Sequence, residues 1–322
     1  MKPYYASLDL GGTNMHAAIA DSEGVVMAEG KEPTLSYEGP TAVMQRMAAL
    51  VKRLEQVCGQ KPEALGIGVP GLIDLQSGTT LFFPNMPTQW RNIPVRETME
   101  ALVQCPVHLL NDARVATLGE LVFGHGRTVQ DMIFFTLGTG VGGGVVIDGK
   151  LRLGPFGAAG ELGHQTMIPD GLACSCGNRG CLETLASGPA LAAEGVRLML
   201  SGNAPLLHEI CGGDIGRITP KTMAEAVAKG EPLVLAAIER MAGWIGIAAA
   251  NMVTALHPQL IVLGGGVSEL GELLLKPVRD TTHQRVGMFP THEVRVEQSM
   301  LRDRAGLLGG IALAMQRGIH SD

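Results

Sequence analysis

Residues 4–20 read Tyr-Tyr-Ala-Ser-Leu-Asp-Leu-Gly-Gly-Thr-Asn-Met-His-Ala-Ala-Ile-Ala: an apolar run, a pair of glycines and a second apolar run. This pattern predicts strands over residues 4–10 and 15–20, and a third strand over 24–29 follows a polar turn at 21–24. Loops this short join antiparallel neighbours. The N-terminal segment is therefore predicted to be an antiparallel hairpin meander.

The same pattern returns in the second half of the chain. Residues 132–137 predict a strand, 138–144 a glycine turn, and 144–147 a second strand that Asp148-Gly149 closes. Two halves that open alike predict an α/β protein with two duplicated domains facing each other across a cleft. We place the boundary near Asp112, so that residues 1–112 with 303–322 form a small domain and residues 113–302 form a larger one.

Apolar residues elsewhere in the chain recur at helical or strand spacing. Helices are predicted over residues 41–57, 189–200, 221–229, 231–256 and 303–317, with a further helix beginning at Asn111-Asp112. Strands are predicted over residues 64–69, 106–110, 259–263 and 293–297.

Composition and charge exclude several classes of protein. The 322 residues carry 25 Lys and Arg against 31 Asp and Glu, a formal net charge of −6, which argues against a nucleic-acid partner. Hydrophobic residues make up 46% of the chain, too many for a disordered protein. The N-terminus has no signal-type apolar core, and no stretch approaches the ~18 uninterrupted apolar residues of a membrane span. We therefore expect a cytoplasmic protein without a membrane partner.

The glycine-rich turns are candidate phosphate-binding loops. In Asp9-Leu-Gly-Gly-Thr-Asn14, Gly11 and Gly12 let successive N–H groups point at an anion, and Thr13 and Asn14 add side-chain donors. Asp9 is placed to hold a phosphate-bound Mg²⁺ through water. An ordinary hairpin turn is the alternative.

Two later glycine segments follow the same logic. Leu137-Gly-Thr-Gly-Val-Gly-Gly-Gly144 precedes a strand rather than the helix of a dinucleotide fingerprint, and it lacks the Lys-Ser/Thr ending of a P-loop. Gly264-Gly265-Gly266 follows a predicted strand, at the end where open α/β sheets bind ligands. A plain glycine cap is the alternative for this last site.

Three cysteines cluster near a histidine. Cys174, Cys176 and Cys181 fall within eight residues, and with His164 they make a Cys₃His set, the composition of a closed structural zinc site. Four protein ligands leave no open position for a zinc-bound water, which disfavours hydrolytic chemistry. Zinc does not need Glu161 or Glu183, so we interpret these as acceptors for ligand hydroxyl groups. Buried thiols without a metal are the alternative.

These motifs together resemble the ROK family of sugar kinases, in the actin-like ATPase superfamily, and among them the bacterial zinc-containing glucokinases. The resemblance runs from Asp9 to the final helix and also rests on Gly-Ile-Gly-Val-Pro-Gly at 66–71, Pro84-Asn85, Asn111-Asp112-Ala113, Gly-Glu-Leu-Gly-His at 160–164 and Cys-Ser-Cys-Gly-Asn-Arg-Gly-Cys-Leu-Glu at 174–183. It implies two actin-like, ribonuclease-H-like ATPase domains flanking a cleft, with a zinc-binding loop at 161–183 in the larger domain.

The resemblance also implies residue roles and cofactors. Asp112 resembles the catalytic base. The residues that resemble hexose binders are Asn85, Asn111, Glu161, His164 and Glu183. Those that resemble the nucleotide site are Gly11, Gly12, Thr13, Thr139, Gly140 and Gly265. The implied cofactors are ATP with Mg²⁺ and a structural Zn²⁺, and the family suggests a homodimer or homotetramer.

The expected activity is therefore ATP-dependent phosphorylation of a hexose at its 6-hydroxyl, with glucose as the first candidate. N-acetylmannosamine, N-acetylglucosamine and fructose are alternative substrates. A sugar-sensing regulator without catalysis is an alternative of another class, although Asp9 comes too early in the chain to leave room for a DNA-binding segment before it. A zinc-stabilised binding module would leave the glycine loops unexplained.

Overall fold

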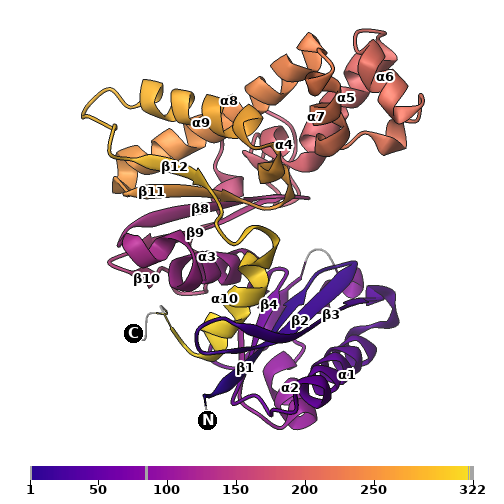
Figure 1. The fold of residues 1–322 in the computed structure, drawn as a ribbon, viewed down its shortest axis with the longest axis vertical. Helices are drawn as coiled ribbons and strands as arrows, with labels where there is room; N and C mark the ends of the chain where they lie inside the picture. The colour runs from indigo at the N-terminus through magenta and orange to yellow at the C-terminus, as the bar shows by residue number, and fades with distance from the viewer. Residues whose placement is uncertain (1, 84–85, 318, 320–322) are drawn as a thin grey trace. The chain divides into compact units, whose positions relative to one another are not determined.

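The computed structural model describes residues 2–83, 86–317 and 319, and within them the strands form two five-stranded sheets of the same design and one small two-stranded sheet (Figure 1). The first sheet has the order β3-β2-β1-β4-β7. Its strands are β1 (Tyr4–Leu10), β2 (Asn14–Asp21), β3 (Val26–Pro33), β4 (Leu65–Val69) and β7 (Val107–Asn111). β1, β2 and β3 form the predicted antiparallel meander, whereas β4 pairs in parallel with β1 and β7.

The second sheet repeats this order as β10-β9-β8-β11-β12. Its strands are β8 (Met132–Leu137), β9 (Val141–Ile147), β10 (Lys150–Leu151), β11 (Leu260–Gly264) and β12 (Arg295–Gln298). β9 and β10 form an antiparallel hairpin, and β11 pairs in parallel with β8 and β12. The prediction of a duplicated α/β fold is confirmed.

The second glycine turn is shorter than predicted. Residues 141–144 belong to β9, so the turn is confined to residues 138–140. A Cβ atom on Gly143 would lie 2.6 Å from Leu162 Cδ1 and 2.7 Å from the Phe134 carbonyl oxygen. Glycine therefore serves close packing inside a strand here, and composition alone does not distinguish that from a turn.

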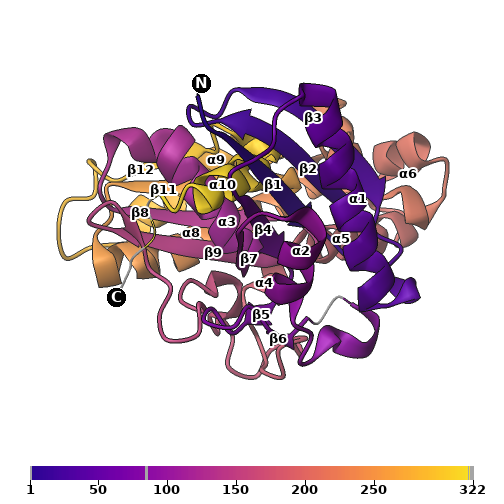
Figure 2. The same cartoon turned by 90° about the horizontal axis from the view of Figure 1, so that it is seen from below.

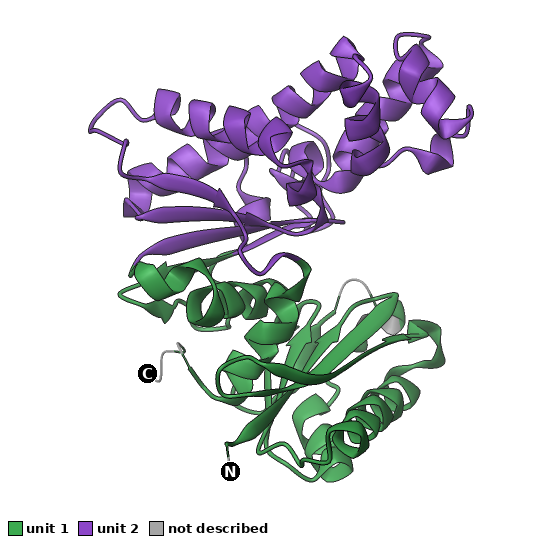
Figure 3. Cartoon of the chain, viewed as in Figure 1, with its two compact units in different colours: residues 1–130, 144–160, 303–322 green, residues 131–143, 161–302 purple. Residues whose placement is uncertain are grey.

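The chain divides into two compact units (Figure 3). Unit 1 comprises residues 1–130, 144–160 and 303–322, and unit 2 comprises residues 131–143 and 161–302. These bounds place α3 (Asp112–Phe123) in unit 1, because it packs against α10 (Ala305–Ala314). The domain division predicted at Asp112 stays a prediction, and it differs from the compact units in where it puts α3 and residues 144–160.

Helices cover both faces of the unit 1 sheet (Figure 1, Figure 2). α1 (Pro40–Cys58) and α2 (Val95–Val103) pack on one face, and α3 with α10 packs on the other. Glycines allow α3 and α10 to approach closely: a Cβ atom on Gly309 would lie 1.8 Å from the Val115 carbonyl oxygen. This close crossing holds the N-terminus of α3 against the sheet. β5 (Leu72–Ile73) and β6 (Thr80–Phe82) form a small separate ribbon.

Unit 2 is mostly helical outside its sheet. Its helices are α4 (Glu183–Ala186), α5 (Gly188–Leu200), α6 (Pro205–Cys211), α7 (Pro220–Ala228), α8 (Pro232–Leu256) and α9 (Glu272–Arg285). By length and composition α8 could cross a membrane, but 56% of its most apolar window is buried, and it packs against α5, α7 and α9. That burial is typical of a core helix. The predictions of α5, α7 and α8 are confirmed, whereas α4, α6 and α9 were not predicted.

Candidate active site and metal centre

Two carboxylates meet at the carboxyl edge of the unit 1 sheet. Asp9 lies near the end of β1, opposite Gly68 on β4, and Asp112 directly follows β7. A Cβ atom on Gly68 would lie 3.5 Å from Asp9 Oδ1 and 3.6 Å from Asp112 Cα, so both aspartates flank this glycine. Parallel pairing of β1, β4 and β7 thus brings together two residues that are 103 positions apart in the sequence.

Asp112 and Asn111 have different roles at the start of α3. The Asn111 side chain caps the helix, since its Oδ1 accepts hydrogen bonds from the backbone N–H groups of Ala113 and Arg114. The exposed Asp112 is the first helical residue, and its Oδ1 accepts from the Ala113 N–H at 2.7 Å. The positive end of the helix dipole favours a carboxylate here. Asp112 is therefore an exposed carboxyl group held at the start of α3 by a backbone N–H.

Asp9 differs from Asp112 in its surroundings. A Cβ atom on Gly306 of α10 would lie only 3.3 Å from Asp9 Oδ2, so the helix packs directly on this carboxylate. Burial and the nearby Asp112 carboxylate raise the pKa of Asp9 to about 7, although Lys31 opposes the shift. A cation beside Asp9 would favour its ionised form.

The raised pKa predicts an unusual pH dependence for Asp9→Asn. The unfolded state ionises Asp9 near its ordinary pKa of 3.8, whereas the folded state keeps the proton up to about pH 7. The wild type is therefore stabilised by protonated Asp9 at low pH and loses that stability as the pH rises to about 7. In metal-free and nucleotide-free protein, we expect Asp9→Asn to raise the thermal midpoint by several degrees at pH 8 and by less at pH 5.

Asp74→Asn is the matched control, because its expected change in thermal midpoint at pH 8 has the opposite sign. Backbone N–H groups of Ser77 and Gln76 lower the pKa of the exposed Asp74. Its ionised form stabilises the fold above the ordinary pKa, so Asp74→Asn should lower the midpoint at pH 8 and matter less as the pH falls toward 3. An Asp9→Asn effect that is the same at pH 5 and pH 8 would contradict the assignment.

The first glycine loop joins β1 to β2 with its residues open to solvent. The Gly11 N–H donates to the Asn14 carbonyl, and Thr34 Oγ1 donates to the Gly11 carbonyl at 2.6 Å. A Cβ atom on Gly11 would lie 2.7 Å from the Asn14 carbonyl oxygen. Gly12 is partly exposed, and the side chains of Thr13 and Asn14 are exposed. The loop is a hairpin turn, and the hairpin does not exclude anion binding.

The second and third glycine segments meet in unit 2. Parallel pairing sets Gly264 of β11 opposite Thr136 of β8, so Thr139-Gly140 and Gly265 both follow the carboxyl ends of neighbouring strands. A Cβ atom on Gly265 would lie 2.5 Å from the Leu137 carbonyl oxygen, and the backbone there has φ +79°. The predicted nucleotide residues of unit 2 therefore lie together.

The four predicted zinc ligands converge. Their ligand atoms lie within 4.8 Å of one another. Cys176 Sγ is 3.7 Å from Cys181 Sγ, and Cys174 Sγ is 3.6 Å from His164 Nδ1. A tetrahedral zinc with Zn–S of ~2.3 Å and Zn–N of ~2.0 Å separates its ligand atoms by about 3.5–3.8 Å. The donor set and its spacing therefore fit zinc.

Burial and crowding shift the pKa values of two of these thiols in opposite directions. Burial and the neighbouring Cys176 and Cys174 thiols raise the pKa of Cys181 to about 12. Burial of Cys176 works against ionisation, but the Asn178 N–H and the other two thiols outweigh it and lower its pKa. Three crowded sulfurs cannot all lose their protons without a positive charge between them. A bound divalent cation supplies that charge and displaces the protons.

Glu183 and His164 link the cysteine cluster to its surroundings. Glu183 Oε2 accepts from the Val141 N–H at 3.0 Å, just after the second glycine turn, and leaves no room for a side chain at Gly140. Its Oε1 lies 3.4 Å from Ser175 Oγ. His164 turns Nδ1 toward the cysteines, and its Nε2 lies 3.8 Å from Glu161 Oε2. Glu161, His164 and Glu183 thus surround one end of the cluster.

The site residues of each unit are therefore brought together within that unit. Asn85 lies outside the described residues. The structure adds residues that sequence patterns did not indicate: Gly306, which packs on Asp9, and Arg114, which donates to Asn111 Oδ1 at 3.1 Å. A basic residue within an apolar helical pattern was the available signal for Arg114.

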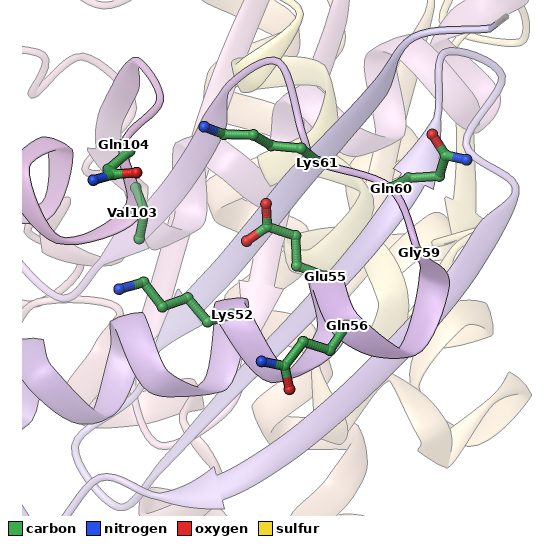
Figure 4. A pocket seen from close by; sticks show the side chains of 8 residues that line it. All are labelled: Lys52, Glu55, Gln56, Gly59, Gln60, Lys61, Val103 and Gln104. Carbon is green, nitrogen blue, oxygen red and sulfur yellow. The ribbon is translucent and has the colours of Figure 1, made fainter.

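A surface cavity of about 440 Å³ lies elsewhere in unit 1 (Figure 4). It is lined by Lys52, Glu55, Gln56, Gly59, Gln60, Lys61, Val103 and Gln104. These residues come from the C-terminal ends of α1 and α2, which lead into the starts of β4 and β7. The cavity is thus at the sheet edge opposite Asp9 and Asp112, and it contains no predicted site residue.

Comparison with known proteins shows to which family this chain belongs. The chain belongs to the ROK family, whose sequence model matches residues 5–317. The glucokinase of Streptomyces coelicolor is 36% identical over 312 residues, covering 96% of each chain. The ROK family glucokinase from Streptomyces griseus, solved in complex with glucose and AMPPNP, superposes with a TM-score of 0.86 at 36% identity, covering 97% of this chain and 99% of that one. The xylose repressor of Caldicellulosiruptor bescii is 34% identical over 311 residues, covering 96% of this chain and 77% of the repressor.

Proposed function

We propose that this protein is an ATP-dependent hexose kinase that transfers the γ-phosphoryl group to the 6-hydroxyl of glucose. The observation that carries the proposal is the pair of aspartates at the unit 1 strand ends. Asp112 is exposed at the start of α3, whereas Asp9 is packed beneath α10 and suited to a cation. The glucokinases among the relatives support the same reaction. N-acetylmannosamine, N-acetylglucosamine and fructose are the alternative substrates.

Asp112 acts as the general base. Its carboxylate, held at the start of α3 by the Ala113 N–H, takes the proton of the sugar hydroxyl as the hydroxyl oxygen attacks the γ-phosphorus. Phosphoryl transfer asks chiefly for positioning and for neutralisation of charge on the phosphate oxygens. Asp9 would hold a phosphate-bound Mg²⁺ through water, and such an ion would neutralise charge on the phosphate oxygens. Backbone N–H groups and side chains of the glycine loops hold the nucleotide through Gly11, Gly12, Thr13, Asn14, Thr139, Gly140 and Gly265.

Neutral amides and carboxylates bind the hexose. The residues proposed for this role are Asn85, Asn111, Glu161, His164 and Glu183. His164 serves both sites, because Nδ1 faces the cysteines while Nε2 stays on the side of Glu161. Cys174, Cys176, Cys181 and His164 would hold a structural zinc, because four protein ligands would fix the loop and the His164 ring and leave no open position on the metal.

We propose a cytoplasmic homodimer or homotetramer without nucleic-acid or membrane partners. Three clustered thiols that hold zinc suit a reducing compartment. The net charge of −6 also disfavours a broad nucleic-acid surface.

An ADP-release assay over a panel of sugars tests the activity. We expect glucose to give the highest kcat/KM, ahead of N-acetylmannosamine, N-acetylglucosamine and fructose. Xylose is the matched control, because it has no sixth carbon to phosphorylate. Glucose or xylose binding without ADP release would instead favour a sugar-sensing regulator, the function named for the repressor relative. Faster turnover of an N-acetylhexosamine would replace glucose as the substrate.

A further inference from the structure

Arg114 is a charged side chain that lies almost fully inside unit 1. It is 1% exposed and sits in α3, two residues after Asp112. A buried guanidinium is costly unless its N–H groups find acceptors. The acceptors of its hydrogen bonds therefore indicate which parts of the structure Arg114 stabilises.

The guanidinium connects two separate parts of the chain. Nη1 donates to Asn111 Oδ1 at 3.1 Å. Nε donates to the Ala159 carbonyl and Nη2 to the Ala158 carbonyl, both at 2.9 Å. Arginine presents such donors in a rigid planar fork, whereas a lysine ammonium is a single point on a flexible stem. Only arginine among the basic side chains can therefore hold all three acceptors at once.

The first contact fixes which way the Asn111 amide faces. Asn111 Oδ1 accepts from Arg114 Nη1 and from the N–H groups of Ala113 and Arg114, at 3.1 and 3.4 Å. Asn111 Nδ2 donates to the Gly71 carbonyl at 3.3 Å. A flipped amide would set its NH₂ group against three donors and its oxygen against a carbonyl. The Asn111 oxygen therefore already accepts three hydrogen bonds, so a ligand that reaches this side chain would meet its NH₂ group.

The second contact fixes the backbone where the chain leaves unit 1. Ala158 and Ala159 are followed by Gly160, the last residue of that segment of unit 1, and then by Glu161. Gly160 has φ +92°, a backbone conformation that residues with a side chain rarely adopt. Arg114 thus holds the residues just before a proposed hexose-binding glutamate.

We propose that Arg114 is a positioning residue for the hexose. It orients the Asn111 amide so that nitrogen faces the sugar, and it anchors residues 158–159 ahead of Glu161. It does so through these groups and touches neither sugar nor phosphate. The proposal rests on the proposed function, in which Asn111 and Glu161 bind the hexose.

Arg114→Lys keeps the charge but loses the fork. We expect KM for the hexose to rise at least about tenfold, while kcat changes less than threefold and KM for ATP less than twofold. A double-mutant cycle with Asn111→Ala tests the route: if Arg114 acts through Asn111, Arg114→Lys should raise KM less in that background than in the wild type. Full additivity, or an unchanged hexose KM, would overturn the proposal.

Arg96→Lys is the matched control. Arg96 also donates to three backbone carbonyls, those of Val107, Gln76 and Leu75, but none belongs to a proposed site residue. This variant should lower the thermal midpoint and leave KM for the hexose within twofold of wild type. An equal rise in hexose KM for both variants would reduce Arg114 to a merely structural role.

A measurement on the wild type tests the proposal even if the Arg114→Lys variant does not fold. Saturating hexose, without ATP, should shift the side-chain NH₂ resonances of Asn111 in ¹⁵N-edited NMR spectra. No shift at saturation would overturn the amide orientation. Wild-type turnover separates the two claims: no hexose binding or turnover by the wild type overturns both, whereas normal wild-type turnover with an unchanged KM in Arg114→Lys overturns only the role of Arg114.

Discussion

Asp112→Asn should lower kcat for hexose phosphorylation by at least about 10²-fold, because general-base contributions run to ~10²–10⁴-fold. The amide cannot accept the hydroxyl proton, but it is nearly isosteric and keeps an oxygen for the Ala113 N–H that Asp112 Oδ1 now accepts. The fold and the sugar affinity should therefore persist. The glucose-dependent rise in thermal midpoint measures that affinity without turnover, and the coupled assay measures kcat.

Asp214→Asn is the matched control for this change. Asp214 is likewise an exposed aspartate at the start of a helical turn, and its Oδ1 accepts from the Gly216 N–H at 2.8 Å. Asp214 is not among the proposed site residues, so the kcat of Asp214→Asn should stay within twofold of the wild-type value. An Asp112→Asn enzyme that retains more than a tenth of wild-type kcat would exclude Asp112 as the base.

Loss of the zinc site should have the second large effect. Cys181 is fully buried, and we expect Cys181→Ser to reduce zinc from about one ion per chain to well below it. A structural zinc contributes several kcal/mol of folding free energy, so the thermal midpoint should fall by about 10 °C or more. KM for glucose should rise, because Glu161, His164 and Glu183 surround the cluster. KM for ATP should rise less, through the Glu183 contact to the Val141 N–H.

Cys211→Ser separates zinc loss from the loss of a buried thiol. Cys211 is also fully buried, but it lies on α6 and is not one of the four clustered ligands. This variant should keep its zinc and its KM for glucose despite some loss of stability. Elemental analysis and thermal melts check both variants. A fully active wild type without zinc would contradict the metal assignment.

Strand and helix patterns predicted most of the fold because the strands are short apolar runs bounded by turn residues and the longer helices have apolar residues at helical spacing. α9 was not predicted, and it contains Pro277, a residue that sequence rules place outside helices. Packing against α8 outweighs that penalty. The sequence places Gly142 and Gly143 in a turn, although they lie in β9. At such positions tertiary contacts determine the secondary structure, and the local spacing of residues does not reveal those contacts.

Compact sequence motifs supplied most of the candidate site residues. The zinc ligands lie within 18 residues of one another, and the motif for Asp112 is a tripeptide. Sequence patterns did not indicate Arg114 or Gly306, because the contacts of both residues arise from packing between distant parts of the chain. Arg114 donates to carbonyls 44 and 45 residues away, and Gly306 lies 297 residues from Asp9 in the sequence. No local pattern signals a partner at such distance.

The central claim is phosphoryl transfer from ATP to the 6-hydroxyl of a hexose, and NMR of the product tests it most directly. Zinc-loaded wild type should be incubated with MgATP and glucose, and the products followed by ³¹P and ¹H spectra. We predict one phosphomonoester on carbon 6 of glucose for each ADP formed. Inorganic phosphate with unchanged glucose, or no consumption of ATP in the presence of any hexose of the panel, would contradict the account.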